Sequence, residues 1–284
     1  MPFSLVKDIF WHKPKTLFRC LKEFGLKSTL KIALSYLGVR IYFTIKYPFS
    51  GIKATVRSNL FWKNLEKGYW WESNSYKYIS NVVKEGQIIL DMGACYGSYT
   101  LLFSKLVRDG GHVYAFEPDP KAFDILCDNI EKNHLTNAHI DKICISNSVG
   151  EAKLRAGRFG TGASSMIGDE PGTALRETIV ETTTIDKYCE ENRICPDGIK
   201  MDIEGAEGLA IDGCRNIIKK CSPWILLEFH GFLMSEEERR TNWHKIVDSA
   251  QKVVFLDGDS KSYHYGSEVK SMPDCLHFHV FIEY

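Results

Sequence analysis

The chain has 284 residues, with 36 Lys and Arg against 36 Asp and Glu, so its formal net charge is zero at neutral pH. This length suits one large domain, or one ordinary domain with an addition, and it allows a sizeable buried core. A balanced charge excludes any overall attraction to nucleic acid or to an acidic partner. The balance hides an asymmetry, because residues 1–64 hold twelve Lys and Arg against two Asp and Glu, which leaves 24 against 34 in the remainder.

The nine cysteines include no C-x-x-C pair and no close spacing to histidine of the kind that zinc sites use. Several lie in apolar runs, where a free cysteine acts as a small buried hydrophobe. We therefore expect reduced cysteines and a cytoplasmic location. The first residues lack the pattern of a secretion signal, and no run of about 18 apolar residues predicts a transmembrane helix.

Residues 1–76 are predicted to form a basic and aromatic helical extension ahead of a domain over residues 77–284. Its dense apolar stretch, residues 30–45, has two open interpretations. One is a helix that packs on the main domain or on a second subunit of a homo-oligomer. The other is a basic amphipathic segment that makes peripheral contact with an anionic membrane surface. Seven aromatic residues between Phe61 and Tyr78 are expected to pack in the core or to line a pocket.

From residue 85 onward, strand-like and helix-like stretches alternate, which is typical of a parallel sheet with crossover helices. We predict strands at residues 88–90, 112–116, 138–145, 198–203, 224–229, 252–256 and 277–282. Helices are expected at residues 99–107, 122–133, 185–192, 208–220 and 236–250. A stretch rich in Gly, Ser and Thr, residues 155–172, is predicted to be a loop, followed by a short extra strand at 179–184.

A glycine turn follows the first predicted strand and precedes a helix, the place where a nucleotide-like ligand binds in such sheets. Gly93 can adopt φ values closed to other residues and lets a ligand approach the backbone, whereas Gly97 allows the helix to pack closely on the strand. Asp91 can accept hydrogen bonds from the turn amides or reach a ligand ammonium through water. Any α/β turn with two glycines has the same appearance, so the turn alone is a weak signal.

An acid closes the second predicted strand. Glu117 lies 24 residues beyond Gly93, where an acid of nucleotide-binding folds accepts both ribose hydroxyls. A dinucleotide dehydrogenase uses an acid in the same way. The G-x-G-x-x-G pattern is absent, however, because Cys95 occupies the second glycine position. The sequence therefore favours a ribose-containing ligand other than NAD.

Two further strands end in acids. Asp202 and Glu204 follow the fourth predicted strand, and alternation places them on one side of an extended chain. Capping of the next helix by Glu204 or Glu207 is the competing interpretation. The fifth strand ends in Glu228 and His230. Because carboxyl ends of parallel strands meet at one edge of the sheet, we expect Asp202, Glu204, Glu228 and His230 to converge.

Together these motifs resemble the FkbM family of S-adenosylmethionine-dependent methyltransferases over roughly residues 80–232. The matching segments, in the family's order, are 88–100, 113–120, 145–151, 182–188 and 199–207. The resemblance implies an α/β fold of the class I methyltransferase (Rossmann-like) type, with a seven-stranded, mostly parallel sheet, its last strand antiparallel, and helices on both faces. It implies S-adenosyl-L-methionine as cofactor and a hydroxyl on a sugar, glycan or secondary metabolite as methyl acceptor.

The resemblance also assigns residues to the cofactor. Asp91, Gly93, Ala94 and Gly97 would hold its methionine end. Glu117 would hold its ribose, and Ser146 and Asn147 would lie near its adenine. Asp202 would also contact the cofactor and, with Glu204, lie by the transferred methyl. Cys95 stands where the family usually has asparagine, a departure that affects a hydrogen bond of the loop and not the fold.

A hydroxyl acceptor must lose its proton, so a general base is expected. Asp202 and Glu204 suit that role by position and His230 by its ordinary pKa near neutrality; we prefer an acid from the fourth strand. No residue is assigned as a metal ligand, although the acids could instead bind a divalent cation that lowers the pKa of the hydroxyl.

Two other functions stay open. One is a nucleic-acid (RNA) methyltransferase, which the missing Asn-Pro-Pro-Tyr type of motif and the confinement of basic charge to the N-terminus disfavour. The other is a binding protein that holds S-adenosylmethionine without catalysis.

Overall fold

The computed structural model describes residues 26, 40–47, 49–57, 72–156, 164–165, 176–256, 262–264 and 276–284. The chain divides into two compact units, residues 1–73 and 74–284, where the sequence predicted a boundary after residue 76. Most of the predicted helical extension, five of the seven aromatic residues between Phe61 and Tyr78, and residues 157–163 and 166–172 of the predicted loop lie outside the described residues. Within the described residues, no helix combines the length and apolarity needed to cross a membrane.

The first unit contains an antiparallel hairpin of β1 (Tyr42–Lys46) and β2 (Lys53–Arg57). The prediction of a helical extension is therefore wrong for these residues. β1 is rich in aromatic and β-branched side chains, and β2 contains the β-branched Thr55 and Val56; such side chains suit a pleated strand better than a helix. Gly51 adopts a φ of 71° in the connecting turn, where the amide of Tyr47 donates to the carbonyl of Ile52.

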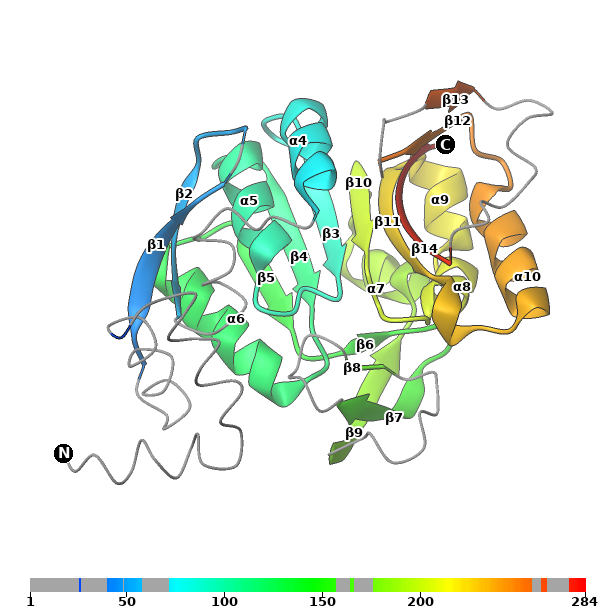
Figure 1. The fold of residues 1–284 in the computed structure, drawn as a ribbon, viewed down its shortest axis with the longest axis horizontal. Helices are drawn as coiled ribbons and strands as arrows, with labels where there is room; N and C mark the ends of the chain where they lie inside the picture. The colour runs from blue at the N-terminus through cyan, green and yellow to red at the C-terminus, as the bar shows by residue number, and fades with distance from the viewer. Residues whose placement is uncertain are drawn as a thin grey trace. The chain divides into compact units, whose positions relative to one another are not determined.

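The second unit is built on an eight-stranded sheet with the order β13-β12-β14-β11-β10-β3-β4-β5 (Figure 1). Its strands are β3 (Ile88–Met92), β4 (His112–Phe116), β5 (Ala138–Asp141), β10 (Gly198–Met201), β11 (Trp224–His230), β12 (Lys252–Phe255), β13 (Ser262–His264) and β14 (His277–Glu283). Neighbours from β5 to β11 are parallel, and β14 is antiparallel to β11 and β12. The predicted mostly parallel sheet with its antiparallel last strand is confirmed, and β13 adds an eighth strand at the edge.

Helices connect these strands. They are α4 (Ser73–Val82), α5 (Ser98–Val107), α6 (Pro120–Lys132), α7 (Ile185–Asn192), α8 (Glu207–Asp212), α9 (Arg215–Cys221), the 3-10 turn η2 (Gly231–Leu233) and α10 (Glu236–Val247). Local signals fix several of their ends: Asp119 caps α6 with Pro120 in its first turn, and Ser235 and Glu238 form a capping box on α10. The helix predicted at 208–220 is in fact two helices. They meet at Gly213, where a Cβ would overlap the carbonyl oxygen of Ser146.

One face of the sheet, which we call the apolar face, packs against α7, α8, α9 and α10 through one core cluster. Side chains alternate between the two faces along each strand. The central strands contribute Leu90, Met92, Ile199, Met201, Ile225, Leu227 and Phe229 to this cluster.

The opposite face, which we call the mixed face, changes character along the strands. At their amino end Trp224 lies across Gly198, where a Cβ would overlap the indole ring, and stacks on Phe281. Phe103 of α5 contacts Trp224, and Tyr78 of α4 contacts Phe281, so these helices cover the apolar end. Toward the carboxyl end, the same face carries Asp91, Lys200, Glu228 and His230.

A separate four-stranded sheet has the order β6-β9-β7-β8. Its strands are β6 (Cys144–Ile145), β7 (Gly150–Ala156), β8 (Ser164–Ser165) and β9 (Arg176–Thr183). The single strand predicted at 138–145 is therefore wrong, because β5 and β6 belong to different sheets. The loop predicted at 155–172 contains β8 and the end of β7, and the predicted extra strand is the longer β9, whose pairing with β7 no local pattern reveals.

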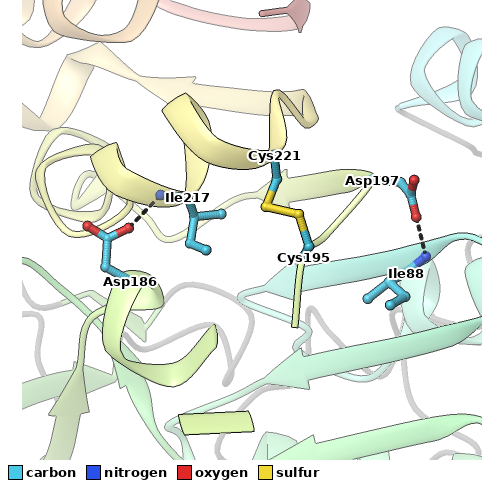
Figure 2. The surroundings of a disulfide bond; sticks show 6 residues. All are labelled: Ile88, Asp186, Cys195, Asp197, Ile217 and Cys221. Carbon is cyan, nitrogen blue, oxygen red and sulfur yellow. Dashed lines mark hydrogen bonds between the residues drawn. A yellow bond between two sulfur atoms is a disulfide. The ribbon is translucent and has the colours of Figure 1, made fainter. Parts of the chain in front are cut away.

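A disulfide joins Cys195, ahead of β10, to Cys221 at the end of α9, ahead of β11 (Figure 2). The expectation of reduced cysteines is wrong for this pair, which is 26 residues apart in sequence and becomes adjacent only in the fold. Beside it, the Asp197 carboxylate accepts a hydrogen bond from the amide of Ile88 at 2.7 Å. The starts of β3, β10 and β11 are thus joined by covalent and hydrogen bonds.

Candidate functional site

The turn after β3 touches the end of β10. Gly93 has a φ of 74°, and a Cβ there would overlap the carbonyl oxygen of Asp202. The amides of Gly93 and Ala94 both donate to the carbonyl of Phe116 at 3.0 Å. Gly97 has a φ of 88° and faces Leu126 of α6, so it permits helix–helix contact and not the predicted helix–strand contact. The turn is therefore held between the ends of β4 and β10.

Glu117 lies across this turn and is only 5% exposed. Its Oε2 accepts from the amide of Cys95 and its Oε1 from the amide of Asp119, each at 2.7 Å. Burial raises the pKa of Glu117 to about 8, against the lowering effect of these two bonds. Each oxygen keeps a second lone pair, which is the arrangement that a vicinal diol requires. Cys95 adopts the left-handed region, with a φ of 51°, so its backbone contributes the amide that holds Glu117.

Lys200 contacts the turn and the two acids Asp91 and Asp202. It was not predicted from the sequence. It is 4% exposed, and its Nζ donates to the carbonyl of Gly93 at 3.0 Å and to Oδ2 of Asp202 at 3.1 Å. The same Nζ lies 3.6 Å from Oδ1 of Asp91. A buried lysine is rare unless paired. A lysine within an otherwise apolar buried strand was the signal that could have revealed it.

Asp91 is fully buried. One of the two roles predicted for it, accepting hydrogen bonds from the turn amides, is not what the structure shows. Its Oδ2 accepts from the hydroxyl of Thr100 at 2.6 Å. Its Oδ1 makes no hydrogen bond among the described residues. A buried oxygen without a donor is costly, and it is a feature expected of a site that receives a donor from a ligand or water.

The predicted convergence of acids with His230 is confirmed. The Nδ1 of His230 is 2.8 Å from Oε1 of Glu207, and because a carboxylate oxygen only accepts, Nδ1 donates. The Nε2 points to three acids: Glu228 at 3.6 Å, Glu204 at 3.7 Å and Asp202 at 3.9 Å. Glu204 has a φ of 53°, so the chain turns sharply just after β10. Glu207 is thus the partner of His230, besides accepting from the amide of Gly205.

These contacts set the charges of the cluster. Burial alone would lower the pKa of His230, but the bond to Glu207 and the charge of Asp202 raise that pKa to about 10. Burial and the charge of Asp202 raise the pKa of Glu204 to about 7. Burial and the charge of Glu228 raise the pKa of Asp202. His230 in this network is a cation that cannot take up a further proton.

Two histidines of β14 complete the cluster, and sequence reading missed both. Glu228 is opposite His279 in the pairing of β11 with β14, and His230 is opposite His277. Oε1 of Glu228 is 2.7 Å from Nε2 of His277, and its Oε2 is 3.4 Å from Nε2 of His279. Burial would raise the pKa of Glu228, but the hydrogen bond from His277 and the neighbouring His279 and His230 hold that pKa well below its usual range. The His-x-His alternation in the last strand was the available signal.

Ser146 and Asn147 lie where the chain passes into the four-stranded sheet. The amide of Ser146 donates to the carbonyl of Thr183 at 2.9 Å, and its own carbonyl packs on Gly213. Asn147 is exposed. Cys144, two residues earlier, is buried, and burial together with the charge of Glu117 raises the pKa of its thiol to about 12. The adenine role of Ser146 and Asn147 stays a prediction.

The described residues fit the cofactor that the sequence implied. The turn at Gly93, the Asp91 oxygen without a hydrogen bond and the two backbone-held oxygens of Glu117 form one polar edge among the described residues. This edge lies at the carboxyl ends of parallel strands, in a sheet with an antiparallel strand next to the last parallel one. Fold and site together define the class I methyltransferase architecture.

The chain belongs to the FkbM methyltransferase family, since the family model described as "Methyltransferase FkbM domain" matches residues 91–265. Two curated relatives are similar to parts of it. The 31-O-demethyl-FK506 methyltransferase FkbM of Streptomyces tacrolimicus is 32% identical over 100 residues, covering 35% of this chain and 36% of the relative. The hexuronic acid methyltransferase AglP of Haloferax volcanii is 21% identical over 160 residues, covering 56% and 62%. The chain thus spans less than two thirds of either relative's length.

Two solved structures are also similar. The methyltransferase FkbM of Methylobacillus flagellatus matches with a TM-score of 0.45 and 14% identity, covering 78% of this chain and 54% of that one. An S-adenosylmethionine-dependent methyltransferase of Aquifex aeolicus matches with a TM-score of 0.40 and 14% identity, covering 74% and 88%.

Proposed function

We propose that the protein is an S-adenosylmethionine-dependent O-methyltransferase that acts on a hydroxyl of a sugar, glycan or secondary metabolite. The observation that carries this proposal is the contact of Gly93 with Asp202, which brings the glycine turn and the acids after β10 to one point. A methyl donor held at the turn would then lie beside the group that deprotonates the acceptor.

The turn from Gly93 to Gly97 and the buried Asp91 would hold the methionine end of the cofactor, and Glu117 its ribose. The bound cofactor supplies a methyl group already activated on a sulfonium. The task left to the protein is to align the acceptor, exclude water and remove one proton. Ser146 and Asn147 are kept as the proposed adenine contacts.

Glu204 is the proposed general base. The side chains of Asp202 and Glu204 are 24% and 23% exposed, so both reach the surface of the site. Asp202 shares a hydrogen bond with Lys200, which weakens it as a proton acceptor. His230 is 4% exposed and bonded to Glu207, so it orients the acids as a buried cation instead of accepting the proton.

The names of the two relatives support the acceptor class. The first name specifies an oxygen, the 31-O position of FK506, as the methyl acceptor, and the second specifies a hexuronic acid, which is a sugar acid. The cytoplasmic location, the homo-oligomer and the membrane contact of the basic N-terminus stay predictions; the disulfide is more typical of an oxidising compartment.

Transfer of a labelled methyl group tests the function. The chain is incubated with methyl-labelled cofactor and, separately, with a glucuronic acid-containing oligosaccharide, a hydroxylated macrolide and a total RNA sample. Label is expected on one of the first two, in a base-stable and ether-linked form. Label on RNA alone would reject the proposal, and cofactor binding without transfer to any acceptor would support a non-catalytic binding protein.

The base is tested with Glu204→Gln. Turnover is expected to fall about 10²- to 10⁴-fold, while the calorimetric affinity for the demethylated cofactor stays within about two-fold, because a base acts only in the chemical step. His230→Gln serves as the comparison, since it removes the orienting cation but no acceptor of the proton. Unchanged turnover in Glu204→Gln, with turnover lost in Asp202→Asn, would assign the role to Asp202.

A further inference from the structure

Four side chains form a two-by-two array on the mixed face of the antiparallel pair β11 and β14. Glu228 and His230 are two residues apart on β11, so they point to the same face, and His277 and His279 do the same on β14. The pairing sets Glu228 opposite His279 and His230 opposite His277. Side chains directly opposite in an antiparallel pair have Cβ atoms about 4.5–5.5 Å apart, so the array brings three imidazoles and a carboxylate together.

Three of these groups converge to the spacing of a metal coordination shell. Oε1 of Glu228 lies 2.7 Å from Nε2 of His277 and 3.6 Å from Nε2 of His230. One ligand atom from each of the three residues lies within 4.8 Å of the others. Ligands about 2.1 Å from a common ion are about 3–3.5 Å from one another, so small side-chain rotations would complete the shell.

Neighbouring groups already orient two of the three ligands. Glu207 accepts from Nδ1 of His230, which directs Nε2 toward the cluster. A bound ion would replace the proton that Nε2 carries in the cationic ring, so binding releases that proton to solvent. His279 lies 3.4 Å from the second oxygen of Glu228 and leaves the first oxygen facing His230 and His277. A carboxylate behind a ligating histidine is the usual outer partner in metal sites, where it fixes the ring and its tautomer.

We propose that Glu228, His230 and His277 bind a divalent first-row transition-metal ion, such as Zn²⁺, Fe²⁺ or Co²⁺. Two imidazoles with one carboxylate favour these ions over Mg²⁺, which prefers oxygen ligands. Three protein ligands leave coordination positions for water or a substrate oxygen. Because Nε2 of His230 also lies within 4 Å of Asp202 and Glu204, such an ion would sit beside the proposed acceptor position. The binding itself does not depend on the proposed function.

The test is a Co²⁺ titration of the 284-residue chain after chelator treatment and dialysis, followed by calorimetry and by visible d–d absorption. One Co²⁺ per chain is expected, with at least ten-fold weaker binding in His277→Ala and in Glu228→Gln. The His277 side chain is 45% exposed, so its removal should leave the fold intact, which far-ultraviolet circular dichroism would verify. Mg²⁺ at the same concentration should not compete.

Two control variants make the result specific. His139→Ala removes a histidine of the exposed His112–His139 pair on β4 and β5 and should bind Co²⁺ as the parent does. Asp202→Asn tests the alternative ligand set of Asp202, Glu204 and His230, and should also bind as the parent does. Absence of one-to-one binding, or binding that His277→Ala keeps and Asp202→Asn loses, would overturn the proposal. None of these measurements requires methyl transfer, so failure of the metal-site proposal is distinct from failure of the proposed function.

Discussion

The two ends of strands β3, β10 and β11 are built in opposite ways. At the amino end, a disulfide and the bonds of Asp197 fix the three strands to one another. At the carboxyl end, Lys200 and a group of acids and histidines are crowded together, and Glu204 is in the left-handed region. Buried ion pairs return little net stability, because desolvation offsets their attraction. A disulfide that closes a loop of this length contributes about 3.5 kcal/mol. One end therefore stabilises the fold, and the other end uses that stability to hold a costly arrangement.

Removing the central cation should break the charged end. In Lys200→Met, the buried Asp91 loses the only cation recorded within 4 Å of it among the described residues, and Asp202 loses its hydrogen bond. We expect the free energy of unfolding in urea to fall by about 3–5 kcal/mol, together with loss of cofactor affinity. Lys153→Met, at an exposed position of β7, is the matched control and should change stability by less than about 0.5 kcal/mol. A Lys200→Met variant as stable as the parent would show that the acids do not need this cation.

Removing the disulfide should weaken the other end without touching the chemistry. The double variant Cys195→Ser, Cys221→Ser is expected to lose about 3.5 kcal/mol of unfolding free energy, because its unfolded chain is no longer constrained. Reductant should lower the stability of the parent by a similar amount and leave the double variant unchanged. Turnover at 25 °C should be the same in the parent and in the double variant. A large loss of turnover in the double variant would mean that the amino and carboxyl ends of these strands are coupled.

Glu117 should make the charged end sensitive to pH. Its pKa is about 8 in the folded chain against an ordinary value of 4.5, so between these values the folded state holds a proton that the unfolded state has released. The contribution of Glu117 to the free energy of unfolding is fully present below about pH 4.5. It falls by up to about 1.4 kcal/mol per pH unit as the pH rises, and it stops changing above about pH 8. Urea unfolding at pH 6, 7 and 8 would measure the slope, and Glu117→Gln should flatten it. A slope that survives the substitution would have to come from another group.

The smallest effect is expected from the amino-end carboxylate. Asp197→Ala removes the acceptor of the Ile88 amide at an exposed position, so a loss of about 1 kcal/mol is expected, with no change in turnover. Thermal unfolding and the methyl-transfer rate would be measured on the same preparation. A turnover defect here would contradict the separation of the two ends.

Local patterns were sufficient to predict the elements whose residues decide their own structure. The strand His112–Phe116 and the helix Ile185–Asn192 have the predicted bounds, because alternation, a Thr184 cap and the periodic apolar residues all act within a few positions. The acids after β10 and β11 were expected to meet, since both follow parallel strands. In the N-terminal hairpin, by contrast, apolar density alone did not reveal whether the period was that of a helix or of a strand.

Features that depend on register or on distant pairing could not be predicted. His277 and His279 join the site only because β14 pairs with β11 in one register. Cys195 meets Cys221 only after the crossover through α8 and α9 has returned the chain to the amino end of the sheet. Lys200 could have been suspected as a charge within a buried strand. Two of its partners, however, come from a distant segment of the chain, at the end of β3 and in the turn that follows it.

The disulfide also closes a covalent ring around the segment between Cys195 and Cys221. That ring contains β10, both acids that follow it, α8 and nearly all of α9. A protease that cuts once inside it, after the exposed Arg215 or Lys219 for instance, leaves two fragments that migrate as one species until a reductant is added. The ring therefore provides a simple assay of whether the bond is present in protein taken from its natural source: limited trypsin digestion, compared on reducing and non-reducing gels.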